Sequence, residues 1–150
     1  MSDTNEVEIL LVEDNQDDLD MTLRALRKAN LANRIEVARD GAEALDFIFC
    51  QGKHLGRRIE LTPKVVLLDL KLPKMDGLEV LKRIKSDPRT KIIPVVVLTS
   101  SKEQKDVSTS YNLGANSYIV KPVNFEGFAT AVRALGMFWL LVNQAPRVEG

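Results

Sequence analysis

Residues 64–77 read KVVLLDLKLPKMDG, a continuous apolar run that carries one acid, Asp69, and then passes into turn-forming residues. An unbroken apolar run of this length is typical of a strand that is buried on both faces of a sheet. An ionised carboxylate is costly to bury without a partner. The position of Asp69 at the end of such a strand therefore predicts a functional role for it.

Apolar strands and amphipathic helices are expected to alternate on both sides of this run. Strands are expected over 7–12, 34–39, 64–70, 92–99 and 117–120, and helices over 16–29, 41–50, 78–87, 103–113 and 125–142. This alternation predicts a parallel sheet that is covered by helices on both faces. Right-handed crossover connections then favour a doubly wound α/β fold.

Several residues mark where elements begin and end. Asn15 is expected to cap the helix over 16–29, and Ser100 and Ser101 to cap the helix over 103–113. Gly114 follows that helix, where a glycine in the left-handed region commonly ends one. Residues 51–63 are expected to form a solvated loop, and Cys50 a small buried apolar residue.

Length and composition indicate one domain over residues 1–150, with its core at about 7–142 and no output domain. Twenty-one basic and 21 acidic residues give a net charge of zero, which argues against a nucleic-acid partner. The longest apolar run, 134–142, has nine residues, whereas a membrane span needs about 20. The acidic start does not resemble a signal peptide, so a cytoplasmic location is expected. A single cysteine and a single histidine exclude an internal disulfide and a structural zinc site.

The net charge of zero conceals an acidic pole, because the first 20 residues hold eight acids and no base. Glu13 and Asp14 end the first expected strand. Asp17, Asp18 and Asp20 follow in the first turns of the next helix, where acids are favoured by the helix dipole. These three are interpreted as helix acids rather than as metal ligands.

Parallel strands bring their carboxyl ends to one edge of the sheet, which is where doubly wound folds bind ligands. That edge is predicted to gather Glu13, Asp14, Asp69, Thr99 and Lys121. Crowded carboxylates raise one another's pKa, and a divalent cation such as Mg²⁺, which prefers hard oxygen ligands, relieves the repulsion. A carboxylate beside Mg²⁺ is a competent nucleophile toward phosphorus, and the ammonium of Lys121 can neutralise the transferring oxygens. The pattern therefore predicts an aspartyl-phosphate on Asp69, with the Thr99 hydroxyl as a hydrogen-bond donor to the phosphoryl group.

The segments VEILLVEDN, VVLLDLKLPKMDGLEVLKRIK, PVVVLTSS and GANSYIVKP, in this order, resemble the receiver domain of two-component response regulators over about residues 7–141. The resemblance implies a flavodoxin-like (βα)5 sandwich with a five-stranded parallel sheet of order 2-1-3-4-5. It implies that the chain is a signalling protein that accepts a phosphoryl group from a histidine kinase on Asp69. It also implies self-phosphorylation and self-dephosphorylation only, not turnover of an external substrate.

The same resemblance assigns roles to the other residues of the edge. Asp14 would bind Mg²⁺ directly, Glu13 through a metal-bound water, and Lys71 through its backbone carbonyl, and Mn²⁺ would substitute for Mg²⁺. Thr99 would be the switch hydroxyl and Tyr118 the switch aromatic. Lys121 would bind the phosphoryl oxygens, and Pro122 would follow in a cis peptide.

The long loop over 51–64, the segment LGANSYIVKPV and the end FWLLV resemble single-domain receivers that are paired with phytochrome-type histidine kinases. The subgroup often has Asn two positions after the phosphoacceptor, where this chain has Lys71. A cation there could compete with Mg²⁺ or alter the attack of water on the aspartyl-phosphate. The partner would be such a kinase, with a possible relay to a histidine phosphotransfer protein.

The stretch 129–142 carries a single charge, Arg133, and is apolar on all sides. A helix with this pattern is expected to be covered. Phe138, Trp139, Leu140 and Leu141 are therefore predicted to form a homodimer face, and the alternative is that the chain end folds back onto its own domain.

Three other functions remain as alternatives. A phosphatase or phosphomutase would need an acid where Lys71 stands. A flavin- or dinucleotide-binding domain would need a phosphate cradle after the first strand, where the acids would instead repel phosphate. A receiver fold that has lost phosphorylation would act purely as a docking protein.

The basic loop 52–58 could bind nucleic acid, but a solvated loop is favoured because no aromatic residues are interleaved with its basic ones.

Overall fold

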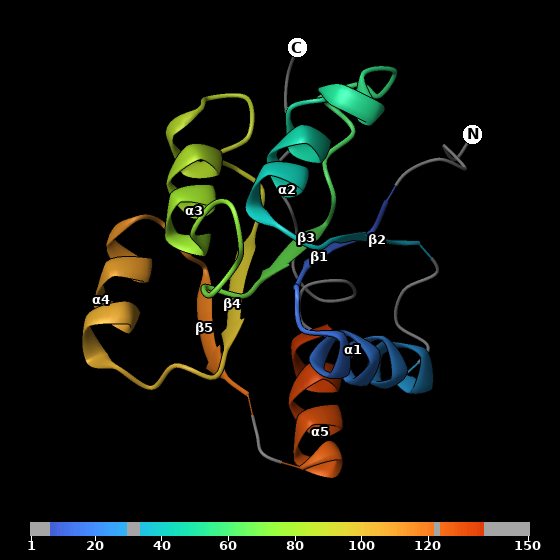
Figure 1. Cartoon of the computed structure of the whole chain (residues 1–150), viewed down its shortest axis with the longest axis vertical. Helices are drawn as coiled ribbons and strands as arrows, with labels where there is room; N and C mark the ends of the chain where they lie inside the picture. Colours follow the sequence, from blue (N-terminus) through green and yellow to red (C-terminus); the bar gives the residue numbers. More distant parts are fainter. Residues whose placement is uncertain (1–6, 30–33, 122–123, 137–150) are drawn as a thin grey trace.

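The structure is a computed structural model that describes residues 7–29, 34–121 and 124–136 (Figure 1). Strands and helices alternate along these residues, as predicted. The strands are β1 (Ile9–Val12), β2 (Ile35–Ala38), β3 (Val65–Leu68), β4 (Val95–Thr99) and β5 (Ser117–Val120). The helices are α1 (Gln16–Ala29), α2 (Gly41–Ile48), α3 (Gly77–Ser86), α4 (Gln104–Asn112) and α5 (Phe125–Gly136), with a 3-10 turn over Gly52–His54.

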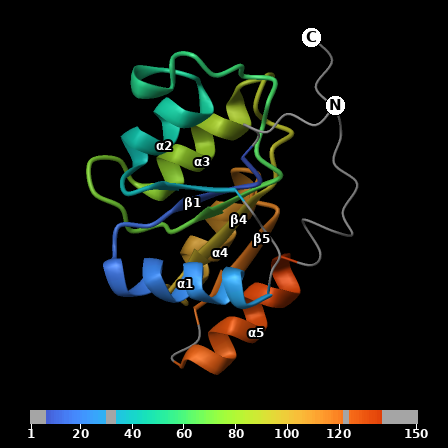
Figure 2. The ribbon, with the colours of Figure 1, turned by 90° about the vertical axis from the view of Figure 1, so that its right-hand side faces the viewer.

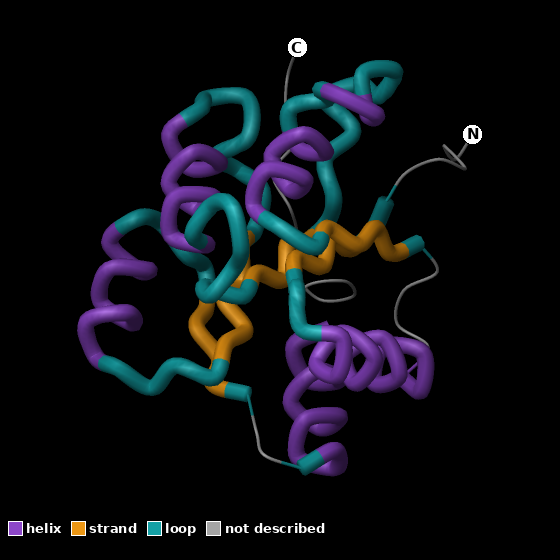
Figure 3. The backbone as a smooth tube through the Cα atoms, viewed as in Figure 1, coloured by secondary structure: helices purple, strands orange, loops and turns teal. Residues whose placement is uncertain are grey.

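The strands lie side by side in one sheet (Figure 3). All pairs are parallel and the order is β2-β1-β3-β4-β5, which confirms the predicted topology. Val12 pairs with Leu68, and Leu68 pairs with Val97. This register brings the residues that follow β1 and β3 level with the end of β4. The site described below is built at that edge.

Helices cover both faces of the sheet (Figure 2). Alternate strand residues such as Leu10 and Val12 pack into a core beneath α2 and α3, while Ile9 and Leu11 pack into a second core beneath α1 and α5. Both faces are buried, which explains why the strands read as continuous apolar runs. Among the described residues, no helix has the length and apolar character that a membrane crossing requires.

Most strands are shorter than predicted. β4 begins only at Val95, because Pro94 has no N–H to contribute to a ladder, although its carbonyl accepts from the backbone N–H of Val66. The last helix is described only to Gly136, so its expected end at residue 142 lies outside the described residues.

Among the predicted capping residues, Asn15 and Gly114 are confirmed, whereas Ser100 and Ser101 are wrong. Asn15 caps α1, since its Oδ1 accepts from the backbone N–H of Asp18 at 2.9 Å. Gly114 follows α4 with a φ of +107°, a left-handed conformation that suits glycine. Ser100 and Ser101 are not the caps of α4. The N-cap is Glu103, because the chain stays extended through that residue.

The loop over 51–63 is mostly exposed at residues 51–58, as predicted, and its residue Arg57 packs against α2. The guanidinium of Arg57 lies over the Phe47 ring at 3.7 Å and donates to the carbonyl oxygens of Phe47 and Leu61. Cys50 is half-buried rather than fully buried, with a φ of +56° at the end of α2. Arg57 therefore fastens the loop to α2.

Candidate functional site

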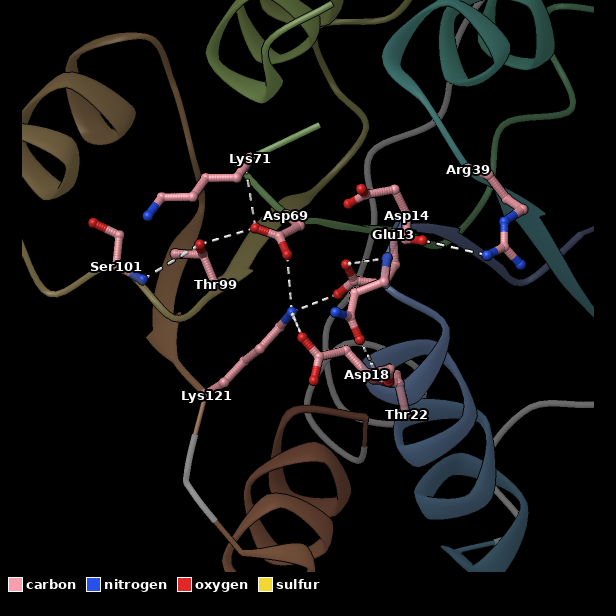
Figure 4. Close-up of polar contacts among 11 residues, drawn as sticks. Glu13, Asp14, Asp18, Thr22, Arg39, Asp69, Lys71, Thr99, Ser101 and Lys121 are labelled. Atoms are coloured by element: carbon pink, nitrogen blue, oxygen red, sulfur yellow. Dashed lines mark hydrogen bonds and ion pairs between the residues drawn. The ribbon is translucent and has the colours of Figure 1, made fainter. Parts of the chain in front are cut away.

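Four of the predicted residues meet at the carboxyl edge of the sheet (Figure 4). Glu13 follows β1, Asp69 follows β3, Thr99 ends β4 and Lys121 follows β5. The side chains of Glu13, Asp69 and Lys121 are only 3%, 11% and 6% exposed. Charged groups this deeply buried require partners, and the four residues supply them to one another.

Lys121 lies at the centre of the site. Its Nζ is 2.5 Å from Glu13 Oε1, 2.9 Å from Asp69 Oδ2 and 2.9 Å from Asp18 Oδ2. An ammonium group has three N–H donors, and these three carboxylates accept all of them. Although burial acts to lower it, the hydrogen bonds to Glu13, Asp18 and Asp69 raise the pKa of Lys121, which keeps the group charged.

Asp69 is held through both of its carboxylate oxygens. Oδ2 accepts from Lys121, while Oδ1 accepts from the Thr99 hydroxyl at 2.9 Å and from the backbone N–H of Lys71 at 3.2 Å. Burial opposes ionisation of Asp69, but hydrogen bonds from Lys121 and Thr99 outweigh it and lower the pKa. The carboxylate is therefore ionised and fixed in orientation, as a nucleophile must be.

Glu13 is a weaker acid in this site than an exposed glutamate. Burial raises its pKa to about 7, with a further contribution from the charge of Asp69, while the hydrogen bond from Lys121 acts in the opposite direction. Its Oε2 also accepts from the backbone N–H of Asn15 at 3.3 Å. A proton or a cation thus stabilises the site near neutral pH.

The site is chemically suited to a divalent metal ion. Carboxylate oxygens of Glu13, Asp18 and Asp69 all lie within 4.8 Å of one another. Hard oxygen donors of this kind are the ligands that Mg²⁺ and Mn²⁺ prefer. Asp14, which the sequence placed in this set, is exposed next to Glu13 and lies outside the three-residue cluster.

Lys71 and Tyr118 lie at the margin of the site. The Lys71 side chain is exposed and points away from Lys121 toward Ser101 (Figure 4). The Tyr118 hydroxyl donates to the carbonyl oxygen of Ser101 at 3.0 Å, in the loop after β4. Two further sets of predicted residues, Pro122 and Phe138 to Leu141, lie outside the described residues.

Sequence reasoning missed Asp18. It lies in the first turn of α1, as predicted, and its side chain also contacts Lys121, which the sequence analysis did not predict. The position of Asp18 in the sequence could have indicated this contact. Asp18 lies one turn into a helix that starts at the sheet edge, next to Glu13. An acid on that turn is close enough to reach the edge.

The profile of the family described as response regulator receiver domain matches residues 9–133. The probable methanogenesis regulatory protein FilR2 of Methanothrix harundinacea (strain 6Ac) is 44% identical over 138 residues, which cover 92% of this chain and 86% of that protein. The response regulator Rcp1 of Synechocystis is 40% identical over 132 residues, which cover 88% of each chain.

Solved structures agree with this result. The crystal structure of the Mn²⁺-bound form of Rcp1 has a TM-score of 0.85 at 38% identity, covering 93% of this chain and 99% of that one. The phosphorylated cyanobacterial phytochrome response regulator RcpA has a TM-score of 0.86 at 39% identity, covering 94% of this chain and 99% of that one.

Proposed function

The chain belongs to the response regulator receiver domain family, and from that premise we propose that Asp69 is its phosphoacceptor. As a response regulator it acts in two-component signal transduction, in which a histidine kinase supplies the phosphoryl group. The observation that carries the assignment is that both oxygens of Asp69 are held, one by Lys121 and one by Thr99.

The proposed reaction is a phosphoryl transfer. A carboxylate oxygen of Asp69 attacks the phosphorus of a phosphohistidine, a P–O bond forms, and the P–N bond breaks with departure of the imidazole. The Lys121 ammonium and the Thr99 hydroxyl bind equatorial phosphoryl oxygens, where charge is spread in the transition state. A bound divalent cation supplies further neutralisation of the transferring oxygens and brings the acids together.

Glu13 and Asp69 are the buried residues that we propose to hold Mg²⁺ or Mn²⁺. Asp14, next to Glu13, and the backbone carbonyl of Lys71, next to Asp69, complete the proposed ligand set. The Mn²⁺-bound form of Rcp1 supports a cation in a site of this kind. The Lys71 side chain points away from Lys121 (Figure 4), and we propose that it alters the attack of water on the aspartyl-phosphate rather than competing with Mg²⁺.

The response is proposed to pass through Thr99 and Tyr118. A phosphoryl group on Asp69 draws the Thr99 hydroxyl away from its present acceptor. The hydroxyl also lies 3.5 Å from the backbone N–H of Ser101, whose carbonyl accepts from Tyr118. Movement of Thr99 would therefore change the loop that Tyr118 contacts and bias the face formed by α4, β5 and α5.

The specific partners also belong to the proposal. A phytochrome-type kinase is supported by the phytochrome response regulator RcpA among the similar structures. Six further points stay predictions. Three concern partners: a homodimer through Phe138 to Leu141, relay to a histidine phosphotransfer protein, and the absence of a nucleic-acid partner. The others are a cytoplasmic location, the lack of turnover on an external substrate, and the single-domain organisation.

The test is incubation with acetyl phosphate and Mg²⁺ followed by intact-mass measurement. One phosphoryl group is expected on the wild type and on Asp17→Asn, which changes an exposed acid outside the site. No addition is expected for Asp69→Asn or in EDTA. If the folded wild type gains nothing, the assignment is wrong and the chain is a phosphorylation-independent docking protein.

A further inference from the structure

We propose that Asp18 is a positioning residue that holds Lys121 when Glu13 and Asp69 are engaged by a metal ion. The proposal rests on the proposed function, which makes Lys121 the phosphoryl-binding cation. It assigns to the first turn of α1 a part in phosphoryl transfer, separate from metal ligation.

The three acceptors of Lys121 are not equivalent. Glu13 and Asp69 are almost fully buried, with side-chain exposures of 3% and 11%, whereas Asp18 lies at the rim with 32%. Glu13 and Asp69 belong to the proposed metal ligands, and Asp18 does not. A cation that binds Glu13 and Asp69 competes with the lysine for the same oxygens.

If Asp18 were absent, loss of the Glu13 and Asp69 contacts would leave Lys121 as a buried ammonium without acceptors, which is unfavourable. Asp18 removes this difficulty, because its Oδ2 accepts from Lys121 at 2.9 Å and is not needed by the metal ion. The ammonium can then remain beside Asp69 with two N–H donors free for phosphoryl oxygens.

The backbone of Asp18 is well placed for this role. Its N–H donates to Asn15 Oδ1 at 2.9 Å, and its carbonyl accepts from the Thr22 hydroxyl at 2.8 Å. The capped first turn therefore fixes the Cα of Asp18 relative to the sheet edge. A side chain on a rigid helix positions a partner more accurately than one on a loop.

A competing explanation is that Asp18 binds the metal ion itself, since one of its oxygens is within 4.8 Å of oxygens from Glu13 and Asp69. The two roles differ when Mg²⁺ is saturating. A metal ligand affects the Mg²⁺ concentration needed, whereas a residue that positions Lys121 affects the rate that remains once Mg²⁺ is bound.

The kinetic test compares phosphorylation rates over a Mg²⁺ series for Asp18→Asn and for Asp17→Asn, a control of equal charge change on the same turn. At saturating Mg²⁺, Asp18→Asn is expected to be about fivefold slower and Asp17→Asn less than about twofold slower, and Asp18→Glu is expected to recover part of the rate. In a Lys121→Met background, Asp18→Asn should slow the reaction by less than about twofold, because the residue acts through Lys121. Recovery of the wild-type rate by Mg²⁺ alone would overturn the proposal in favour of a metal ligand.

A second measurement does not depend on phosphorylation or on the Lys121→Met variant. The NMR signal of the Lys121 side-chain ammonium reports whether its protons are held. In the wild type it should persist with and without Mg²⁺; in Asp18→Asn it should persist without Mg²⁺ and broaden beyond detection with it. Persistence in Asp18→Asn with Mg²⁺, or loss in the wild type with Mg²⁺, would contradict the proposed role.

The two hypotheses fail in different ways. If the wild type takes up no phosphoryl group, the proposed function is wrong, but the ammonium signal still tests whether Asp18 holds Lys121. If phosphorylation proceeds normally and the Lys121 ammonium signal in the presence of Mg²⁺ is the same in Asp18→Asn as in the wild type, the proposed function stands and the positioning role is rejected.

Discussion

The Thr99 hydroxyl donates to Asp69 Oδ1 at 2.9 Å, from the end of β4 to the residue that follows β3. Thr99 is fully buried, so the hydrogen bond is shielded from water. The residue that is proposed to sense the phosphoryl group is thus already in contact with the acid that would carry it. Formation of the aspartyl-phosphate must change this contact.

Replacing Thr99 by valine tests that relationship. Thr99→Val keeps the shape but removes the donor, and we expect a loss of about 1 kcal/mol in the free energy of unfolding, together with slower phosphorylation. Thr90→Val is the matched control, because Thr90 is equally buried and donates to the Ile84 carbonyl at 2.7 Å, away from the site. Urea unfolding and mass measurements should show similar stability losses but slower phosphorylation only for Thr99→Val. Equal phosphorylation rates in the two variants would show that the Thr99 hydroxyl takes no part in the reaction.

Stability without metal should depend on pH through Glu13. Its pKa is raised from 4.5 to about 7, so the folded state binds a proton more tightly than the unfolded state between these values. This contribution is fully present below pH 4.5 and is lost as the pH rises through about 7. Glu13→Gln removes it, and the wild type should lose roughly 1–3 kcal/mol more than the variant between pH 4.5 and 8 in EDTA.

The affinity for Mg²⁺ should increase as the pH rises, whereas the stability of the metal-free protein should decrease. A metal ion must displace the proton from Glu13, so Mg²⁺ binding is expected to tighten as the pH rises through about 7. Calorimetric titration at pH 6 and pH 8 measures this change, and Glu13→Gln should flatten it. An equally steep dependence in that variant would show that another group controls it.

Gly77 should not tolerate a side chain. A Cβ at this position would lie 2.4 Å from the carbonyl oxygen of Asp69 and 2.6 Å from the Cα of Leu70. Gly77→Ala must therefore displace the backbone that carries Asp69, the proposed phosphoacceptor, with an expected destabilisation of about 1–3 kcal/mol and slower phosphorylation. Gly56→Ala is the control, because nothing lies within 4 Å of a Cβ there. Urea unfolding that ranks the two variants equally would contradict this account.

Arg57 should be needed to hold the loop over 51–63. Arg57→Lys keeps the charge but loses the planar group that stacks on Phe47 and donates to two carbonyls, and we expect a destabilisation of about 1–2 kcal/mol. Amide hydrogen exchange in the loop should increase while phosphorylation is unchanged. Arg58→Lys, at a side chain that is 74% exposed, should leave exchange as it is. Unaltered exchange in Arg57→Lys would mean that other contacts fasten the loop.

The alternation of strands and helices was predictable because it depends on patterns along the chain, whereas the strand order came from the resemblance to receiver domains. Buried strands such as Val65–Leu68 show as apolar runs, and Asn15 and Gly114 mark helix ends through local hydrogen bonding and backbone conformation. The caps expected at Ser100 and Ser101 were wrong, because the chain stays extended through Glu103 and α4 begins only at Gln104. Ser101 instead donates to Asp106 and contacts Tyr118 through its carbonyl, in the loop beside the site.

The sequence by itself determined the doubly wound α/β architecture and the residues that meet at the sheet edge: Glu13, Asp69, Thr99 and Lys121 each follow or end a strand, and parallel strands end at one edge. Only the tertiary structure decided how their charges are paired. Lys121 and Asp18 are 103 residues apart in the chain, and their contact depends on the direction of two side chains across the sheet edge. No local pattern records that direction, because it is set by packing of α1 against the sheet and by the requirement that every buried charge have a partner.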